Sequence, residues 1–149
     1  MKYTLEQIPD GEDEVIVKYR NMTQEVTNIL AFLKHSRKRL LGYSGSIQVV
    51  IDISQILYIE SVDGRTFAYT AEDVLRLEYS LAQLEQLLNS INFFRCSKSM
   101  ILNIDKVTAL KSLASNRIDA TMCNGEHILI SRTYASDFRK RLKGGTRNE

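Results

Sequence analysis

The close spacing of short strand-like segments between Leu40 and Tyr79 is the feature that most constrains the fold of this chain. Segments rich in β-branched and aromatic residues alternate there with turn signals such as Asp63-Gly64, which is typical of a hairpin. The segments are 40–43, 47–51, 56–62, 67–70 and 74–79. Parallel strands need a crossover of about a dozen residues or more, and these connections are too short for that. We therefore expect antiparallel strands in a sandwich or an open barrel, and not a doubly wound fold.

Helices are expected on either side of the later strands. The sequence Ser80-Leu81-Ala82-Gln83 is a capping box, a pattern in which side chains bond the free N–H groups of a helix start. Further strands are expected over 106–113, 117–122 and 127–130, and Asn124-Gly125 predicts a hairpin between the last two. The expected fold class is therefore mostly β with flanking helices (α+β).

Residues 1–39 form a unit of a different kind, which we expect to be a short N-terminal βα extension. Its segment 14–20 alternates as a strand does, and a helix is expected to begin near Thr23. Apolar residues at helical spacing form one face of that helix: Val26, Ile29, Leu30 and Leu33. Such a face needs a partner, either the rest of this chain or a second copy. The main domain is expected over 40–143, with a flexible tail over 144–149.

Charge is unevenly distributed along the chain, although the formal net charge is only +2. Residues 1–92 hold nine Lys and Arg against thirteen Asp and Glu, a net charge of −4. Residues 93–149 hold eleven against five, a net charge of +6. The C-terminal third is therefore the part expected to face a polyanion, the alternative being a basic surface that only contacts water.

Reactive groups at catalytic spacing are missing from the sequence. It has no P-loop, no GxSxG elbow and no HExxH motif, and its two histidines, His35 and His127, lie far apart. The cysteines, Cys96 and Cys123, are too few for a disulfide scaffold and lack metal-site spacing. We therefore expect no enzymatic activity, no metal or other cofactor and no small-molecule substrate. A redox role for Cys96 stays open, because cationic residues flank it and cations lower the pKa of a thiol.

Two segments of the basic C-terminal third combine apolar strands with polar, positively charged ends. In segment 93–103 the apolar run 100–102 must be buried, whereas the residues before it can face outward. Those residues are Arg95, Ser97, Lys98 and Ser99. In segment 128–134, Ser131 stands where a helix N-cap is expected, so Arg132 and Thr133 project from the first turn of a helix. Helix N-termini and cations both attract phosphate.

The last helix is expected to have one apolar and one basic face. Its apolar residues recur every four positions: Tyr134, Phe138 and Leu142. The other face carries three consecutive cations: Arg139, Lys140 and Arg141. The apolar face predicts packing on the β domain.

Four motifs follow one another in a definite order and spacing. They are Ile56-Leu57-Tyr58-Ile59-Glu60-Ser61, Ser80-Leu81 with its helix, Phe94-Arg95-Cys96-Ser97-Lys98-Ser99 through to Asn103, and Ile130-Ser131-Arg132-Thr133-Tyr134. Together they resemble the LytTR family of bacterial DNA-binding domains, over roughly 41–142. The resemblance implies an elongated arrangement of small antiparallel β-sheets. It also implies a transcription regulator that recognises DNA sequence with loops and strand ends in place of a recognition helix.

The resemblance further implies that loops enter successive major grooves of double-stranded DNA, with two copies on paired repeats. Three places correspond to the contact positions of the family: the loop after Ser61, the segment before Met100 and the start of the last helix. The residues expected to contact DNA are Arg65, Thr66, Ser97, Lys98, Ser99, Arg132 and Thr133. An arginine such as Arg65 can bond guanine with two N–H groups, whereas Lys98 is a point charge better suited to phosphate.

The extension over 1–39 is too short for the receiver domain of many family members and resembles that of stand-alone members. We expect it to mediate homodimer formation or the docking of a small membrane-protein inhibitor, with packing on its own β domain as the competing interpretation. The chain lacks a signal peptide and an apolar run of ~18 residues, which predicts a cytoplasmic protein. The alternative for the whole chain is a β-rich protein-interaction module that does not bind DNA.

Overall fold

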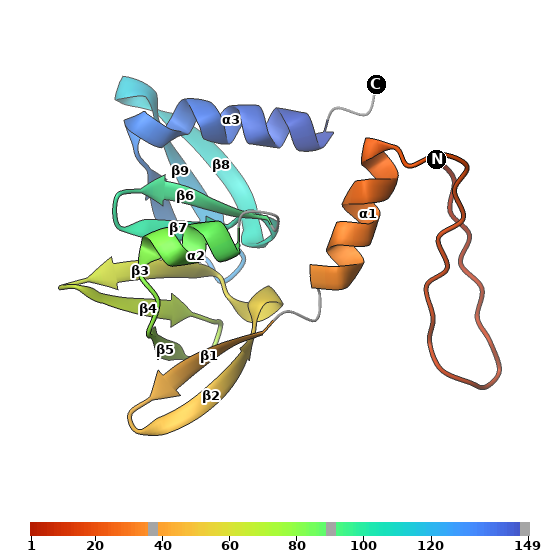
Figure 1. Ribbon diagram of the computed structural model, residues 1–149. Helices are drawn as coiled ribbons and strands as arrows, with labels where there is room; N and C mark the ends of the chain where they lie inside the picture. The colour runs from red at the N-terminus through yellow and green to blue at the C-terminus, as the bar shows by residue number, and fades with distance from the viewer. Residues whose placement is uncertain (36–38, 89–91, 147–149) are drawn as a thin grey trace.

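The computed structural model describes residues 1–35, 39–88 and 92–146, and Figure 1 shows their arrangement. The α-helices in these residues are α1 (Gln24–His35), α2 (Leu81–Leu87) and α3 (Arg132–Thr146). The strands are β1 (Arg39–Ser44), β2 (Ile47–Asp52), β3 (Tyr58–Val62), β4 (Arg65–Tyr69), β5 (Val74–Leu77), β6 (Phe93–Ser97), β7 (Met100–Asn103), β8 (Val107–Leu113), β9 (Arg117–Met122) and β10 (His127–Ile130). Short 3-10 helices are η1 (Ile53–Gln55), η2 (Ile104–Lys106) and η3 (Ala114–Asn116).

The strands form two antiparallel sheets. The larger sheet has the order β2-β1-β5-β4-β3-β7-β6, and the smaller has the order β10-β9-β8. Consecutive strands pair through short turns, as β3 does with β4 and β6 with β7. The predicted antiparallel, mostly β fold with flanking helices is confirmed, because connections this short leave neighbouring strands no other way to pair.

Two hydrophobic cores lie on opposite faces of the larger sheet. The first lies between this sheet and α2, and the second lies between this sheet, the smaller sheet and α3. In β3, Ile59 belongs to the first core and Tyr58 to the second; in β7, Ile101 and Leu102 divide in the same way. Successive side chains of a strand point to opposite faces, so β3 and β7 are buried on both sides. They form a rigid base for the turns at their ends.

The predicted capping box forms at the start of α2. The Ser80 hydroxyl accepts a hydrogen bond of 3.1 Å from the backbone N–H of Gln83. The Gln83 side-chain oxygen accepts one of 2.9 Å from the backbone N–H of Ser80. Leu81 and Leu84 then reach the first core. The prediction of a helix beginning here is therefore confirmed.

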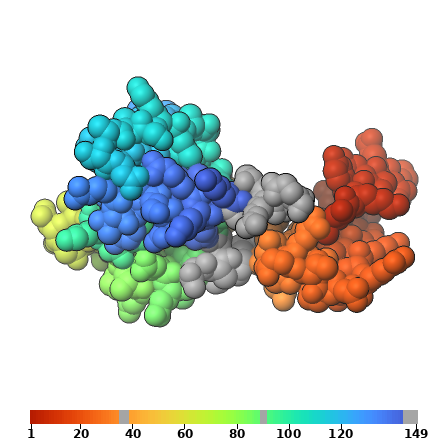
Figure 2. Space-filling model, turned by 90° about the horizontal axis from the view of Figure 1, so that it is seen from above, coloured from red at the N-terminus to blue at the C-terminus, as the bar shows by residue number. Residues whose placement is uncertain are grey.

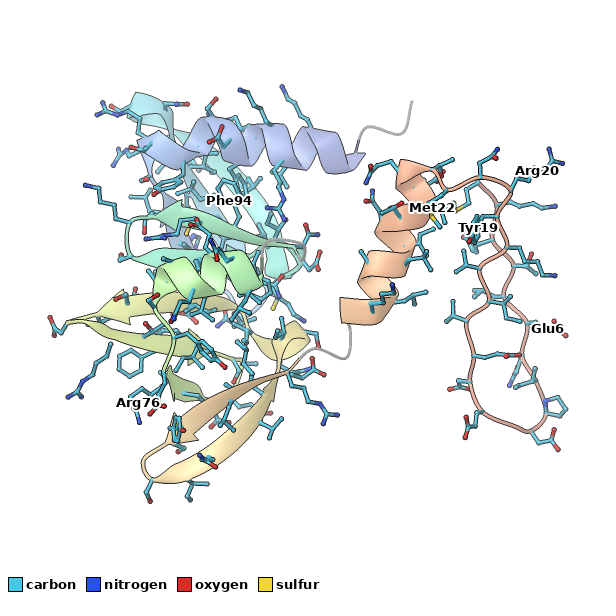
Figure 3. All side chains as sticks on the ribbon, viewed as in Figure 1. Glu6, Tyr19, Arg20, Met22, Arg76 and Phe94 are labelled. Carbon is cyan, nitrogen blue, oxygen red and sulfur yellow. The ribbon has the colours of Figure 1, made fainter. Side chains whose placement is uncertain are left out.

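The last helix, α3, packs on β6 through its apolar face as predicted. Phe138 is fully buried, and its ring meets the Phe94 ring edge-on with 5.2 Å between centroids; Phe94 is labelled in Figure 3. One prediction is wrong: Arg141 is not on the solvent face, because its guanidinium is half-buried and donates a 3.1 Å hydrogen bond to the Phe93 carbonyl. The helix also continues to Thr146, into the predicted tail, and 147–149 lie outside the described residues.

The N-terminal unit differs from the prediction in one element. The helix α1 forms, but the strand expected over 14–20 does not, so the βα unit reduces to a helix and an irregular segment. A strand needs a neighbour to bond its backbone groups, and no sheet edge lies beside this segment among the described residues. Its apolar side chains stay in solvent, with Val15 69% and Ile16 67% exposed. Figure 2 shows this segment and α1 at the opposite end of the molecule from the β3–β4 turn.

Candidate nucleic-acid interface

The first predicted contact segment is the β3–β4 turn, which presents Arg65. Asp63 and Gly64 both have positive φ angles, 51° and 76°, as a two-residue hairpin of this type requires. Val62 then pairs with Arg65 across the hairpin, and the Arg65 side chain is exposed. Thr66 corrects the prediction: its side chain is only 6% exposed, because side chains alternate along β4 and that of Thr66 points inward. The Thr66 side chain is therefore not available to a partner at this turn.

The second segment, containing Lys98, is the β6–β7 turn. Lys98 and Ser99 form its tip and are exposed, whereas Ser97, in the last position of β6, is half-buried. The Ser97 hydroxyl accepts a hydrogen bond of 3.2 Å from the backbone N–H of Ser99, which closes the turn. The sequence pattern over 93–103 did not predict a turn, and the structure shows two strands, β6 and β7, with Lys98 in the turn between them.

Arg95 has a role in this turn that the sequence analysis missed. Its Nε donates a 2.8 Å hydrogen bond to the Ser97 carbonyl, and its Nη2 donates to the Lys98 carbonyl. A carboxylate oxygen of Glu85 on α2 lies 3.7 Å from the Arg95 guanidinium. Arg95 is thus directed at the backbone of the turn and positions it. An arginine three residues before the tip of a tight turn was the signal that could have indicated this.

The third segment is the start of α3. The Ser131 carbonyl accepts hydrogen bonds of 3.0 Å from the backbone N–H groups of Tyr134 and Ala135, so Ser131 occupies the N-cap position as predicted. Arg132 and Thr133 follow in the first turn and are exposed. Ile130 and Ala135, on either side of this junction, are fully buried. The strand before the helix and the first turn after it are therefore firmly anchored in the second core.

Two backbone hydrogen bonds join these three segments. The Ser61 N–H, at the end of β3, donates to the Ser99 carbonyl at 2.8 Å. The Ser131 N–H donates to the Cys96 carbonyl at 3.0 Å. The β3–β4 turn, the β6–β7 turn and the start of α3 therefore follow one another along a single edge, on the left in Figure 1.

The cations of this edge, Arg65, Lys98 and Arg132, are exposed, and none of them pairs with a carboxylate in the part of the chain that the structure describes. The ion pairs found within residues 1–35, 39–88 and 92–146 involve other side chains: Arg76 pairs with Glu78 and Arg95 with Glu85, while the His127 ring lies 3.1 Å from the Asp119 carboxylate. An unneutralised row of cations on a rigid edge attracts a polyanion, and its attraction weakens with salt.

Cys96 does not fit the redox role left open above. Its side chain is fully buried, and its Sγ lies 3.5 Å from the Met100 carbonyl. Burial raises the pKa of the Cys96 thiol to about 12, outweighing the lowering effects of a backbone hydrogen bond and of Arg95. A reactive cysteine needs a low pKa and access to solvent, and Cys96 has neither.

A metal site and a membrane-spanning helix are not found in the described part of the chain. There, no group of three or more His, Cys, Asp or Glu side chains is placed to hold a metal ion. The same residues include no helix that is long and apolar enough to cross a membrane.

Comparisons with known proteins identify this arrangement. The family model described as the LytTr DNA-binding domain matches residues 47–143. The chain also resembles a solved structure with a TM-score of 0.68 and 29% identity, over 71% of this chain and 97% of that one. That structure is the LytTr DNA-binding domain of a protein described as a methyl-accepting/DNA response regulator from Bacillus cereus.

Curated relatives resemble the same part of the chain. The sensory transduction protein LytT of Bacillus cereus is 30% identical over 95 residues, which are 64% of this chain and 39% of that protein. The LytT protein of Bacillus subtilis is 22% identical over 129 residues, 87% of this chain and 54% of its own length. The chain thus spans well under two thirds of the length of these relatives. From the family match, the fold and the shared motifs, this chain belongs to the LytTR family of DNA-binding domain proteins.

Proposed function

We propose that this protein is a sequence-specific transcription regulator that binds double-stranded DNA through its edge of two turns and a helix start. The observation that carries the proposal is the pair of backbone hydrogen bonds, from the Ser61 N–H to Ser99 and from the Ser131 N–H to Cys96, which hold three exposed cations on one edge. Preorganised cations bind phosphate without first losing conformational freedom. The LytTR family match supports the same partner.

The three segments divide the work of recognition. Arg65 projects from a tight hairpin and is suited to bond a guanine in the major groove, where a bidentate arginine discriminates most strongly. Lys98, at the tip of the next turn, contributes a point charge for phosphate, with Ser97 and Ser99 as neutral hydrogen-bonding neighbours. Arg132 and Thr133 meet the DNA backbone at the start of α3, where free N–H groups also favour phosphate. Thr66 is left out of this set because it is buried.

The protein acts in this proposal as a cytoplasmic homodimer on paired repeats. Support comes from the N-terminal unit, which lies away from the DNA edge and exposes apolar side chains: Phe32 on α1 is 68% exposed, and Ile16 is 67% exposed. A second copy that covered this unit would leave both DNA edges free. A small membrane-protein inhibitor that docked on the same surface would compete with dimer formation. The regulator needs no catalytic step, because recognition of DNA alone performs its task.

Selection of bound duplexes from a random library tests this function directly. We expect a consensus of two repeats, bound with an affinity that falls steeply as salt rises, by a slope of about −0.9 in log K against log salt for each phosphate contacted. Recovery of no consensus, with no salt-dependent binding to any duplex, would favour the alternative of a protein-interaction module.

A further inference from the structure

The β8–β9 turn lies at the same side of the molecule as the three segments above (Figure 1). It consists of η3, in which Ser115 and Asn116 have positive φ angles of 61° and 58°. The Nε of Arg117 donates a 3.2 Å hydrogen bond to the Ala114 carbonyl and closes the turn. The three residues of η3 and Arg117 after them are all exposed.

A side-chain contact ties this turn to α3. The Nη1 of Arg139 donates a hydrogen bond to the Asn116 side-chain oxygen, across 23 residues of sequence. Arg139 lies seven residues after Arg132, about two helical turns or ~10.5 Å further along α3, on nearly the same flank. Two cations on one flank of a helix can face the same polyanion. The turn therefore extends the edge beyond Arg132.

The charge of this region is not cancelled by the nearby carboxylates. The acidic residue of α3, Asp137, lies on the other flank of the helix, where it lines a cavity with Arg95 and Arg141. Asp119 on β9 faces His127, whose Nδ1 is 3.1 Å away, and lies opposite Lys111 on β8. Arg117 and Arg139 thus remain as cations beside the turn.

We propose that the β8–β9 turn and the adjoining flank of α3 form a fourth DNA contact, in which Arg117 and Arg139 bind backbone phosphates and Asn116 positions Arg139. This inference rests on the DNA-binding function proposed above. Phosphate is the favoured target because a hydrogen bond holds each arginine to the β8–β9 turn, which leaves its guanidinium less free than that of Arg65 to follow a base edge. Contacts of this kind add affinity and orientation but no sequence preference.

Salt-dependent binding of the full chain separates this contact from the others. The probes are a duplex with the selected repeat and a duplex of unrelated sequence. We expect Arg117→Ala and Arg139→Ala each to reduce the slope of log K against log salt by about 1, and to weaken both duplexes by the same factor. Arg39→Ala is the charge-matched control. Arg39 is exposed and is the first residue of β1, outside the three contact segments and the β8–β9 turn, so its loss should leave both slopes unchanged.

Two further variants test the positioning role and guard against misfolding. Asn116→Gly removes the side chain but tolerates the φ of 58°, so the turn is kept while Arg139 loses its partner. It should weaken both duplexes several-fold with a smaller change in slope than Arg139→Ala. Arg139→Lys keeps the charge and should keep the slope. Equal melting temperatures of the variants show that the fold is intact.

The outcomes distinguish the two proposals. The natural chain could bind with a steep salt slope that Lys98→Ala reduces, while Arg117→Ala and Arg139→Ala behave like Arg39→Ala. That result would overturn the fourth contact and leave the proposed function standing. A change in base preference with Arg117→Ala, without a change in slope, also overturns the phosphate assignment. Absence of any salt-dependent binding by the natural chain overturns both.

Discussion

The Tyr58 hydroxyl donates a hydrogen bond of 2.9 Å to the Glu126 carboxylate, and this contact joins the two sheets across 68 residues of chain. Tyr58 lies on β3, which leads to the Arg65 turn, and Glu126 lies just before β10, which leads to α3. The Tyr58 ring also stacks on Tyr69 with 4.3 Å between centroids. The contact therefore ties together the two halves of the protein that carry the proposed DNA edge.

Removal of the Tyr58 hydroxyl should lower stability modestly. We expect Tyr58→Phe to reduce the free energy of unfolding by about 0.5–1.5 kcal/mol, near the lower end because Glu126 is exposed and regains water. Urea denaturation measures this change. Tyr43→Phe is the matched control, since its hydroxyl bonds the exposed Gln48 side chain, and it should cost less. Equal losses in the two variants would contradict a linking role for Tyr58.

Stability should fall at alkaline pH. Burial, reinforced by Glu126, raises the pKa of Tyr58; burial also raises the pKa of Tyr69, and that of Cys96 to about 12. The folded state therefore keeps protons that the unfolded chain releases above the ordinary values of about 8.5 for Cys and 10 for Tyr. The free energy of unfolding is therefore highest below the unfolded-state pKa values, and it falls as pH rises from these values toward the raised values of the folded state. The urea midpoint of the natural chain, measured from pH 7 to 11, should show this fall. In Tyr58→Phe the fall above pH 10 should be shallower. The same fall in both proteins would exclude Tyr58 as a source of the pH dependence.

The two turn cations should differ in what they contribute to DNA binding. Arg65→Ala should cost about 1–3 kcal/mol on the selected duplex and relax the preference at one base position. Lys98→Ala should weaken all duplexes alike and reduce the salt slope by about 1. Arg65→Lys keeps the charge but loses the paired N–H groups, so it should still relax the base preference. Small and equal effects of the Arg65 and Lys98 variants would refute the assignment of base and phosphate contacts.

Arg95 should act on DNA binding through the turn that it holds. A lysine cannot bond the Ser97 and Lys98 carbonyls together as the Arg95 guanidinium does. We expect Arg95→Lys to lower affinity several-fold with a smaller fall in the salt slope than Lys98→Ala causes, because Lys98 keeps its charge and only its position is loosened. Fluorescence anisotropy at several salt concentrations separates this result from that of Lys98→Ala. Affinity equal to that of the natural chain would show that the turn needs no anchor.

The apolar N-terminal unit should hold a dimer together. We expect Phe32→Asp to convert the full chain to a monomer, because a charge on this exposed side chain would be buried in the proposed interface. Thr27→Asp introduces the same charge on another face of α1 and should leave the dimer intact. Sedimentation equilibrium reports the mass. A natural chain that is already monomeric would exclude the dimer.

Much of the fold was predictable because it depends on neighbours in sequence. The Ser80 to Gln83 box sets a helix start, and Asp63-Gly64 sets a two-residue hairpin, since both patterns act within one turn of chain. Short connections impose antiparallel pairing in the same way. The hairpin that carries Arg65 and the helix start that carries Arg132 were located from such local patterns, whereas the turn that carries Lys98 was not.

Features that depend on distant parts of the chain were not predictable. Segment 14–20 has the pattern of a strand, but no sheet edge lies beside it among the described residues. Thr66 follows the exposed Arg65 but is buried. The Arg141 side chain points inward and donates a hydrogen bond to the Phe93 carbonyl. The sequence by itself determined the local conformations, because these follow from residues a few positions apart. Only the tertiary structure decided that the two turns and the helix start form one edge. That edge depends on hydrogen bonds, such as the one from Ser61 to Ser99, and on core packing between residues that are far apart in the chain.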